Sequence, residues 1–178
     1  MTNQKNELTV DEVKLQASLE KKDTKVGSLV QLIIFKLGEE EYALNIDQIK
    51  EVVLTPGIAK IPQTPEYIMG VANIRGNVIA IVDLKKKFSM GDKDDEFCNY
   101  TLVVESANFK IGILVKEVPN TLTVAESDID KSSTVLQYSN LDEECIMGIV
   151  TSNERMIILV DMIKMMESEG MNKLTNNK

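Results

Sequence analysis

Apolar residues recur along the chain in short runs, some alternating with polar positions and some continuous. Such runs predict strands, because successive side chains on a strand point to opposite faces and a strand buried on both faces is apolar throughout. The clearest runs lie at 32–37, 42–46, 78–82, 102–104, 111–115 and 156–160. Turn-forming residues such as Leu37-Gly38-Glu39 and Arg75-Gly76-Asn77 separate them. We therefore expect a mainly β protein of roughly ten short strands arranged as one or two small barrels.

The two ends of the chain differ from this middle. Residues 1–28 are rich in charged and amide side chains with weak helical spacing, and they predict a mobile or partly helical tail. Residues 29–167 form the predicted domain, which closes with a short helix at Met162–Met166. Residues 168–178 are polar again and predict a second tail.

The middle also contains an internal repeat. Ile68-Met69-Gly70 recurs as Ile146-Met147-Gly148, a shift of 78 positions. The same shift places Ile79 on Ile157, Val82 on Val160 and Asp83 on Asp161 without a gap. Each copy predicts a strand, a tight connection, a second strand and an Asp that opens a short helical turn. We expect two structurally similar halves packed as paired barrels.

Composition excludes several classes of function. A formal net charge of -8 and a single basic run, Lys85-Lys86-Lys87, argue against a nucleic-acid binder. No apolar stretch is long enough for a membrane span, and the first thirty or so residues lack the apolar core of a signal peptide. We therefore expect a cytoplasmic protein in which Cys98 and Cys145 are reduced.

The candidate chemistry is sparse. The sequence has no histidine, which removes the commonest general base and the commonest metal ligand. Asp83 and Asp161 each precede a helical segment and are interpreted as helix caps. The acidic run Asp92–Glu96 begins like a calcium loop, but Phe97 and Val103 stand where that loop needs Gly and Glu. We expect no catalytic residue, no metal site and no cofactor.

Asn73-Ile74-Arg75-Gly76 remains as a charged element between two apolar strands. One interpretation is a hairpin turn in which Gly76 or Asn77 takes a positive φ and Arg75 points to water. The other gives Arg75 a binding role, because the repeat has Asn153 at the matching position and so does not itself require arginine. Arginine can hold a carboxylate with charge-assisted hydrogen bonds, and Glu51 is a candidate partner within the chain.

The chain resembles the CheW family of chemotaxis coupling proteins. The residues from Phe35 to Ile46, followed by Ile49-Lys50-Glu51-Val52, are similar to the opening of the family. Its signature core is matched by Ile61–Gly70, Asn73-Ile74-Arg75-Gly76 and Ile81-Val82-Asp83-Leu84. The similarity continues through 111–115, 147–148 and 156–161, so that it covers about 29–167 in order.

This resemblance implies a fold and a role. The fold would be two five-stranded barrels of SH3-like or OB-like type that share a hydrophobic core, with short helices and a C-terminal helix. The role would be a non-catalytic adaptor that couples chemoreceptors, the methyl-accepting chemotaxis proteins, to the histidine kinase CheA. One face of the first half would bind the regulatory domain of the kinase, and a groove between the halves would take the cytoplasmic tip of a receptor. The adaptor would reach receptor arrays at the inner face of the membrane through these partners.

Site residues follow by motif position. The resemblance implies that Ile49, Glu51 and Arg75 lie at, or support, the kinase-facing side. It also implies that four glycines lie at turns or at close packing contacts and in this way support the interfaces: Gly70, Gly76, Gly112 and Gly148. Three apolar residues are expected in the receptor groove: Leu102, Val103 and Ile113. The sequence departs from the family at Ala80, where Pro is often found, and at Lys116, where an acidic residue is common.

Other functions stay open at this point. The chain could be the homologous coupling protein of a pilus- or gliding-motility pathway, which the sequence does not separate from flagellar chemotaxis. A function of another class would be a small β-barrel enzyme that works with Asp, Glu, Lys or Cys alone. A domain detached from a larger kinase is disfavoured by the polar tails.

Overall fold

The structure is a computed structural model that describes residues 27–91, 97–132 and 145–168. Its strands are β1 (Leu29–Leu37), β2 (Glu40–Asn45), β3 (Ile49–Leu54), β4 (Ile68–Ile74), β5 (Asn77–Val82), β6 (Tyr100–Glu105), β7 (Lys110–Val115), β8 (Asn120–Ala125), β9 (Ile129–Asp130), β10 (Ile146–Ser152) and β11 (Arg155–Val160). Its helices are α2 (Leu84–Lys87) and α4 (Met162–Ser168), with 3-10 turns η1 (Ile46–Gln48) and η2 (Glu126–Asp128). The mainly β prediction is confirmed.

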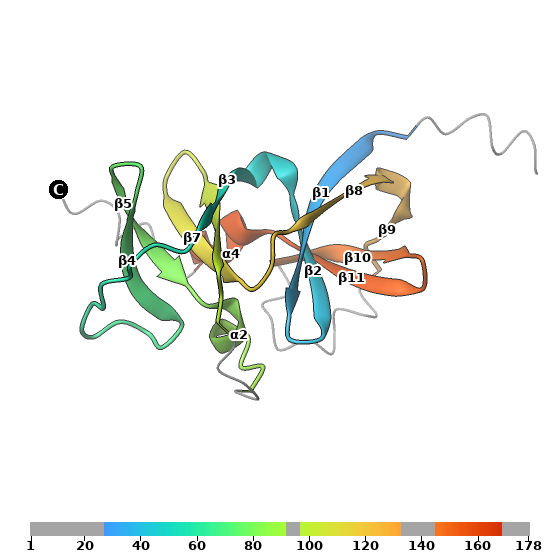
Figure 1. Cartoon of the computed structure of the whole chain (residues 1–178). Coiled ribbons are helices and arrows are strands. Elements are labelled where there is room, and N and C mark those ends of the chain that lie inside the picture. Colours follow the sequence, from blue (N-terminus) through green and yellow to red (C-terminus); the bar gives the residue numbers. More distant parts are fainter. Residues whose placement is uncertain (1–26, 92–96, 133–144, 169–178) are drawn as a thin grey trace, which may run out of the picture.

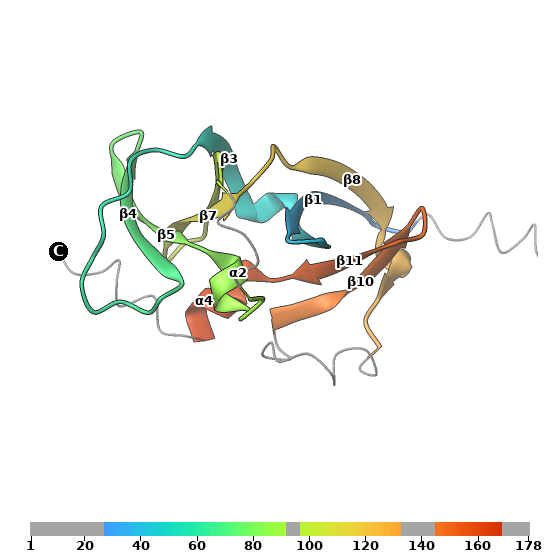
Figure 2. The same cartoon turned by 60° about the horizontal axis from the view of Figure 1, so that its bottom comes forward.

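Two sheets divide the strands. One has five strands in the order β3-β6-β7-β5-β4, and the other has six in the order β8-β1-β2-β11-β10-β9. In Figure 1 the five-stranded sheet lies on the left and the six-stranded sheet on the right. Figure 2 shows α2 and α4 in the middle of the molecule between them. The sixth strand, β9, has two residues, and its counterpart in the five-stranded sheet is an isolated bridge between Ala59 and Val71.

The six-stranded sheet combines the two ends of the domain, β1–β2 and β8–β11, whereas the strands of the five-stranded sheet all lie within residues 49–115. The hairpin β1–β2 joins the six-stranded sheet through a parallel pairing of β2 with β11, and β6–β7 joins the five-stranded sheet through a parallel pairing of β7 with β5. The repeated segments occupy equivalent places, because β4–β5 and β10–β11 are each antiparallel hairpins that add to the sheet by a parallel pair.

The shared core explains the continuous apolar runs. A central cluster takes Phe35 and Leu44 from one sheet, Leu102 and Ile113 from the other, and Met162 from α4. Separate clusters fill the interior of each sheet. Strands such as β7, whose last five residues are all buried, therefore have apolar neighbours on both faces. The predicted pair of barrels with a shared hydrophobic centre agrees with this arrangement.

Both copies of the repeat carry a register shift at a glycine. The shifts lie between Ile68 and Gly70 and between Ile146 and Gly148. Gly70 has a φ of 139°, and a Cβ there would run into the carbonyl group of Ala59. A Cβ on Gly148, with a φ of 156°, would lie 2.7 Å from the carbonyl oxygen of Asp130. Glycine at these places lets a neighbouring backbone approach closely.

The two aspartates of the repeat cap the helices as predicted. The Asp83 carboxylate accepts hydrogen bonds from the backbone N–H groups of Lys85 and Lys86. Asp161 accepts in the same way from Ile163 and Lys164. These bonds satisfy N–H groups that the first turn of a helix leaves unpaired.

The domain boundaries expected from the sequence, 29 and 167, stay a prediction. Strand β1 begins at Leu29 and α4 ends at Ser168. The predicted tails, except Gly27, Ser28 and Ser168, lie outside the described residues, as does the acidic run Asp92–Glu96. Cys98 and Cys145 are not joined in a disulfide bond, as predicted.

The glycine contact makes a testable prediction. Gly70→Ala should lower the free energy of unfolding by about 2 kcal/mol or more, because alanine disfavours this φ and its Cβ displaces Ala59. Gly57→Ala is a matched control, because a Cβ there meets nothing within 4 Å. Urea denaturation of both variants measures the difference. Equal stability of the two variants would contradict the close approach.

Candidate functional site

A two-residue turn joins β4 to β5 and holds Arg75 at its tip. Arg75 has a φ of 50° and Gly76 a φ of 86°, so that both turn residues are left-handed. The side-chain oxygen of Asn73 accepts a hydrogen bond of 2.9 Å from the Gly76 N–H. Gly76 has the predicted positive φ, and Arg75 also has a positive φ. The matching turn of the repeat has Asn153 at 49°, a residue type that tolerates this conformation better than arginine.

Arg75 pairs with Glu51, the candidate partner expected from the sequence. The Nε atom of Arg75 lies 2.5 Å from Oε2 of Glu51 on β3. Strands β3 and β4 are the opposite edges of the five-stranded sheet. The ion pair and the Ala59–Val71 bridge therefore connect these edges and close the barrel. The Arg75 side chain remains 75% exposed, whereas that of Glu51 is 24% exposed.

Exposed apolar side chains lie on the strands that carry this pair. On β3, Val52 is 37% and Leu54 is 72% exposed, and Val78 on β5 is 68% exposed. Ile49, at the start of β3, is half-buried and packs against the central cluster. We call Glu51, Arg75 and Val78, together with Val52 on the opposite face of β3 from Glu51, the turn surface. Exposed apolar residues on the same strands as an accessible arginine are typical of protein interfaces.

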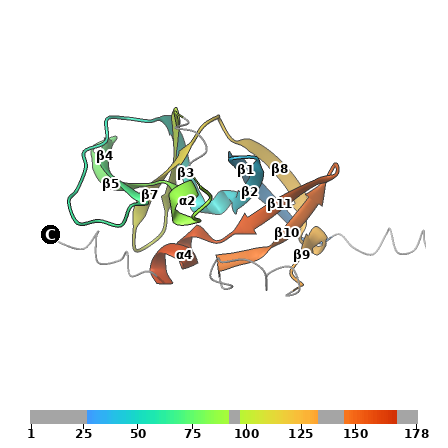
Figure 3. The same cartoon turned by 90° about the horizontal axis from the view of Figure 1, so that it is seen from below.

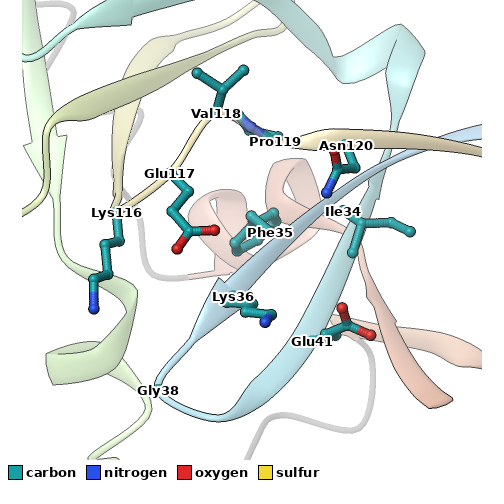
Figure 4. Close-up of a pocket in the computed structure, with 10 residues that line it drawn as sticks. All are labelled: Ile34, Phe35, Lys36, Gly38, Glu41, Lys116, Glu117, Val118, Pro119 and Asn120. Atoms are coloured by element: carbon teal, nitrogen blue, oxygen red, sulfur yellow. The ribbon is translucent and has the colours of Figure 1, made fainter.

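A groove lies where the chain passes from one sheet to the other. Figure 4 shows it between β1–β2 of the six-stranded sheet and the connection that runs from β7 to β8. Its cavity volume is about 210 Å³. The lining residues, here called the inter-sheet groove, are Ile34, Phe35, Lys36, Gly38, Glu41, Lys116, Glu117, Val118, Pro119 and Asn120.

The inter-sheet groove combines charges of both signs with an apolar edge. The Glu117 carboxylate is directed toward β1, while Val118 points away and is 57% exposed. Glu41 forms an ion pair of 3.0 Å with Arg155 across the parallel β2–β11 pairing. Cavities that enclose a small molecule usually reach about 300 Å³ or more. The size of this groove suits a few side chains of a partner protein.

Other residues expected at interfaces lie in the interior. Leu102, Val103 and Ile113 are at most 1% exposed, so their side chains offer no surface to a partner. A Cβ on Gly112 would lie 2.5 Å from Cγ2 of Thr101, which places this glycine at a close packing contact inside the five-stranded sheet. These four residues therefore stabilise the packing of the five-stranded sheet and are not part of its accessible surface.

The polar groups have structural explanations. Burial, followed by the nearby Glu40 carboxylate, raises the pKa of Tyr42, whose hydroxyl donates a hydrogen bond to Glu40. Lys110 and Lys50 lower the pKa of Glu105. Gln48 donates a 3.0 Å hydrogen bond from Nε2 to Asp161, which ties this cap to the turn η1 between β2 and β3. Within the described ranges, no group of three or more His, Cys, Asp or Glu side chains could hold a metal ion.

Sequence reasoning missed the groove and part of the turn surface. The groove residues Lys116–Asn120 form a connection without apolar periodicity, so no pattern marked them. Val52 and Val78 look like core residues in sequence, and only the structure shows their exposure. The departure of Lys116 from the family pattern was the one available signal. In the part of the chain that the structure describes, no helix is long and apolar enough to cross a membrane.

Known proteins similar to this chain come from bacterial chemotaxis. A family model described as "CheW-like domain" matches residues 31–170. "Chemotaxis protein CheW" of Helicobacter pylori is 30% identical over 161 residues, which cover 90% of this chain and 94% of the relative. The protein of the same name from Klebsiella aerogenes is 31% identical over 82% of this chain and 87% of its own length.

A solved structure is also similar to this chain. It is the scaffolding protein TtCheW of Thermoanaerobacter tengcongensis, with a TM-score of 0.67 and 31% identity. The match covers 78% of this chain and 88% of that protein. The two-sheet architecture is thus that of a solved scaffolding protein.

The turn surface makes a prediction about stability. Because Arg75 is largely exposed, its pair with Glu51 should contribute at most about 1 kcal/mol to the free energy of unfolding. Arg75→Gln, Glu51→Gln and the double variant form a double-mutant cycle that measures the coupling energy by urea denaturation. A coupling energy well above about 2 kcal/mol would show that the pair is mainly a stabilising element.

Proposed function

The chain belongs to the CheW family, and from this we propose that it is a non-catalytic adaptor that couples chemoreceptors to a CheA-type histidine kinase. The observation that carries the proposal is the match of residues 31–170 to a single CheW-like domain. The chain spans most of the length of the CheW relatives. A scaffolding role in chemotaxis is shared by the family, and the particular partners and their contact residues are the proposed part.

The turn surface is the proposed contact for the regulatory domain of the kinase. Arg75 is exposed and oriented by Glu51, and Val52 and Val78 add accessible apolar area. A left-handed arginine in a tight turn costs conformational free energy that the hairpin does not require, since Asn153 occupies the matching turn. That cost supports a role for the Arg75 side chain in binding. Ile49 supports the surface from the central cluster.

The inter-sheet groove is the proposed contact for the cytoplasmic tip of a receptor. It is lined by β1, β2, the start of β8 and the connection that leads from one sheet to the other, and none of these strands carries the turn surface. The family resemblance implies a receptor site between the two halves, and this connection joins them. Val118 would pack against apolar side chains of the receptor, and Lys116 and Glu117 would select complementary charges. Leu102, Val103 and Ile113 would then act only by holding the sheet behind the groove.

Adaptor function without catalysis fits the side-chain chemistry. The chain has no histidine, and both repeated aspartates are engaged as helix caps. An adaptor needs two separate binding surfaces on a rigid body. Weak contacts at each surface suffice in an array, because neighbouring contacts raise the effective concentration of each partner.

Co-sedimentation tests the proposal directly. The protein is mixed with receptor-bearing membranes, with the purified kinase, and with both together. An adaptor should bind each partner and should increase the amount of kinase that sediments with the membranes. Binding to only one of the two partners would refute the coupling function.

Arg75→Glu should weaken kinase binding while the protein stays folded. Reversal of the charge places two carboxylates together at the turn surface and should weaken kinase binding at least about tenfold, with little change in the thermal unfolding midpoint. Surface plasmon resonance with the immobilised kinase measures the affinity. Arg155→Glu is the matched control, because Arg155 directly follows the hairpin turn of the repeat and also pairs with a glutamate.

A double exchange decides how Arg75 acts. The variant Glu51→Arg with Arg75→Glu keeps an ion pair across the same edges of the barrel. If Arg75 contacts the kinase directly, binding stays weak in this variant. Recovery of normal binding would instead assign the pair a purely positioning role.

Val118→Glu should weaken receptor binding selectively. A carboxylate at this exposed apolar position beside Glu117 should reduce co-sedimentation with receptor membranes several-fold, whereas kinase affinity stays unchanged. Thr151→Glu on β10 is the control, because it adds the same charge at an exposed strand position outside the groove. Equal loss of kinase binding in Val118→Glu would argue against two separate surfaces.

A further inference from the structure

Asn73 lies on strand β4, two residues before Arg75. It pairs with Val78 on β5 and is exposed, whereas its neighbours Ala72 and Ile74 are buried in the interior cluster of the five-stranded sheet. Packing in the core therefore does not explain this asparagine. Its side chain is engaged instead by the turn that follows.

The turn holds its two central residues in a conformation that suits glycine but not arginine. Ile74 and Asn77 form the last pair of the hairpin, so the turn consists of the two residues between them, Arg75 and Gly76. A positive φ at both positions is the type I′ turn, whose twist matches that of the two strands. Glycine takes this φ freely, but a side chain makes it unfavourable. An arginine at this place needs a further interaction that holds the backbone.

The Asn73 side chain supplies that interaction. Its Oδ1 atom accepts a 2.9 Å hydrogen bond from the Gly76 N–H, which belongs to the peptide group between Arg75 and Gly76. In the mirror-image type I turn, where both φ angles are negative, this peptide group faces the other side of the hairpin. Its N–H would then point away from the face on which Asn73 lies. The hydrogen bond therefore stabilises the left-handed form of the turn selectively.

The matching turn of the repeat is built differently. Asn153, which tolerates a positive φ, stands there in place of the arginine. Thr151 stands in place of Asn73. The hairpin itself therefore does not require an amide side chain before the turn. Figures 1 and 3 show the two hairpins, β4–β5 and β10–β11, at opposite ends of the molecule.

We propose that Asn73 is a positioning residue for the kinase contact and acts through Arg75. This inference rests on the proposed function, in which the turn surface binds the regulatory domain of the kinase. Asn73 fixes the backbone at Arg75, and Glu51 fixes the Arg75 side chain through Nε. A guanidinium group held in this way is in place when the partner arrives, so that binding loses less conformational entropy.

Loss of the amide should lower the fraction of protein that is ready to bind. Without it, the turn would also populate conformations in which Arg75 does not reach Glu51. The apparent affinity of a partner falls with the fraction of protein in the binding-competent form. Asn73 would thus affect kinase binding without touching the kinase.

Arginine Nε–Hε resonances report the position of Arg75 without any partner. The chain has two arginines, so the spectrum contains two such signals. Arg155 is a built-in reference, because it pairs with Glu41 through Nη1 at the other hairpin. Asn73→Ala should move the Arg75 signal toward that of free arginine and speed its exchange with solvent, while the Arg155 signal stays in place. Asn73→Asp, which keeps an acceptor oxygen, should retain the slow exchange of the wild type.

Surface plasmon resonance with the immobilised kinase measures the consequence for binding. Asn73→Ala should weaken kinase affinity about threefold, as expected for the loss of one exposed hydrogen bond. Asn73→Asp should recover most of this loss. Thr151→Ala is the matched control, because it truncates the side chain at the equivalent position of the repeat, and it should bind like the wild type. In an Arg75→Gln background, Asn73→Ala should have no further effect.

The inference is overturned by any of three results. The Arg75 signal of Asn73→Ala keeps its wild-type position and exchange, Asn73→Asp binds the kinase no better than Asn73→Ala, or Asn73→Ala weakens binding equally with and without Arg75. The backbone amide signals of both sheets show that each variant is folded. A wild-type protein that gives the expected Arg75 signal but does not bind the kinase would instead refute the proposed function.

Discussion

The central hydrophobic cluster is the contact on which the rest of the molecule depends. The inner strands of both sheets, such as β1 and β7, have apolar side chains on both faces, and a single small sheet could cover only one of those faces. Packing the two sheets together, with α2 and α4 between them, removes the second face from water. The relative position of the two sheets is therefore fixed by the same residues that make each sheet stable.

This packing would also support the proposed contacts. The turn that carries Arg75 follows β4, and the connection that carries Val118 follows β7, and both strands place buried side chains in the interior of the five-stranded sheet. Binding residues on such supports keep their positions without a large ordering cost when a partner arrives. Under the proposed function, such supports would hold two partners at a defined distance and orientation.

The sequence predicts the buried strands and the two caps well, because continuous apolar runs and the repeated aspartates have few alternatives. Strands β3 and β8 are less visible, since Lys50, Glu51 and two threonines interrupt their apolar pattern. The interleaving of the sheets depends on pairings between distant segments, which local patterns do not specify. For the site, the Glu51–Arg75 contact was predictable from the opposite charges of the two residues. The residues of the groove were not predictable. Leu102, Val103 and Ile113 were expected there because an apolar sequence pattern fits a groove and a core equally well, and the structure places them in the core.

The interleaved strands also constrain how the protein folds. Glu41 on β2 meets Arg155 on β11, 114 positions later in the chain, so the six-stranded sheet cannot close until almost the whole domain has left the ribosome. The strands of the five-stranded sheet, in contrast, all lie within residues 49–115 and are complete before β8 is made. Contacts of long sequence separation slow folding, so the six-stranded sheet should close last. In a nascent chain the hairpin β1–β2 would therefore lack its partner strands β8 and β11 for most of synthesis, which makes early chaperone engagement advantageous.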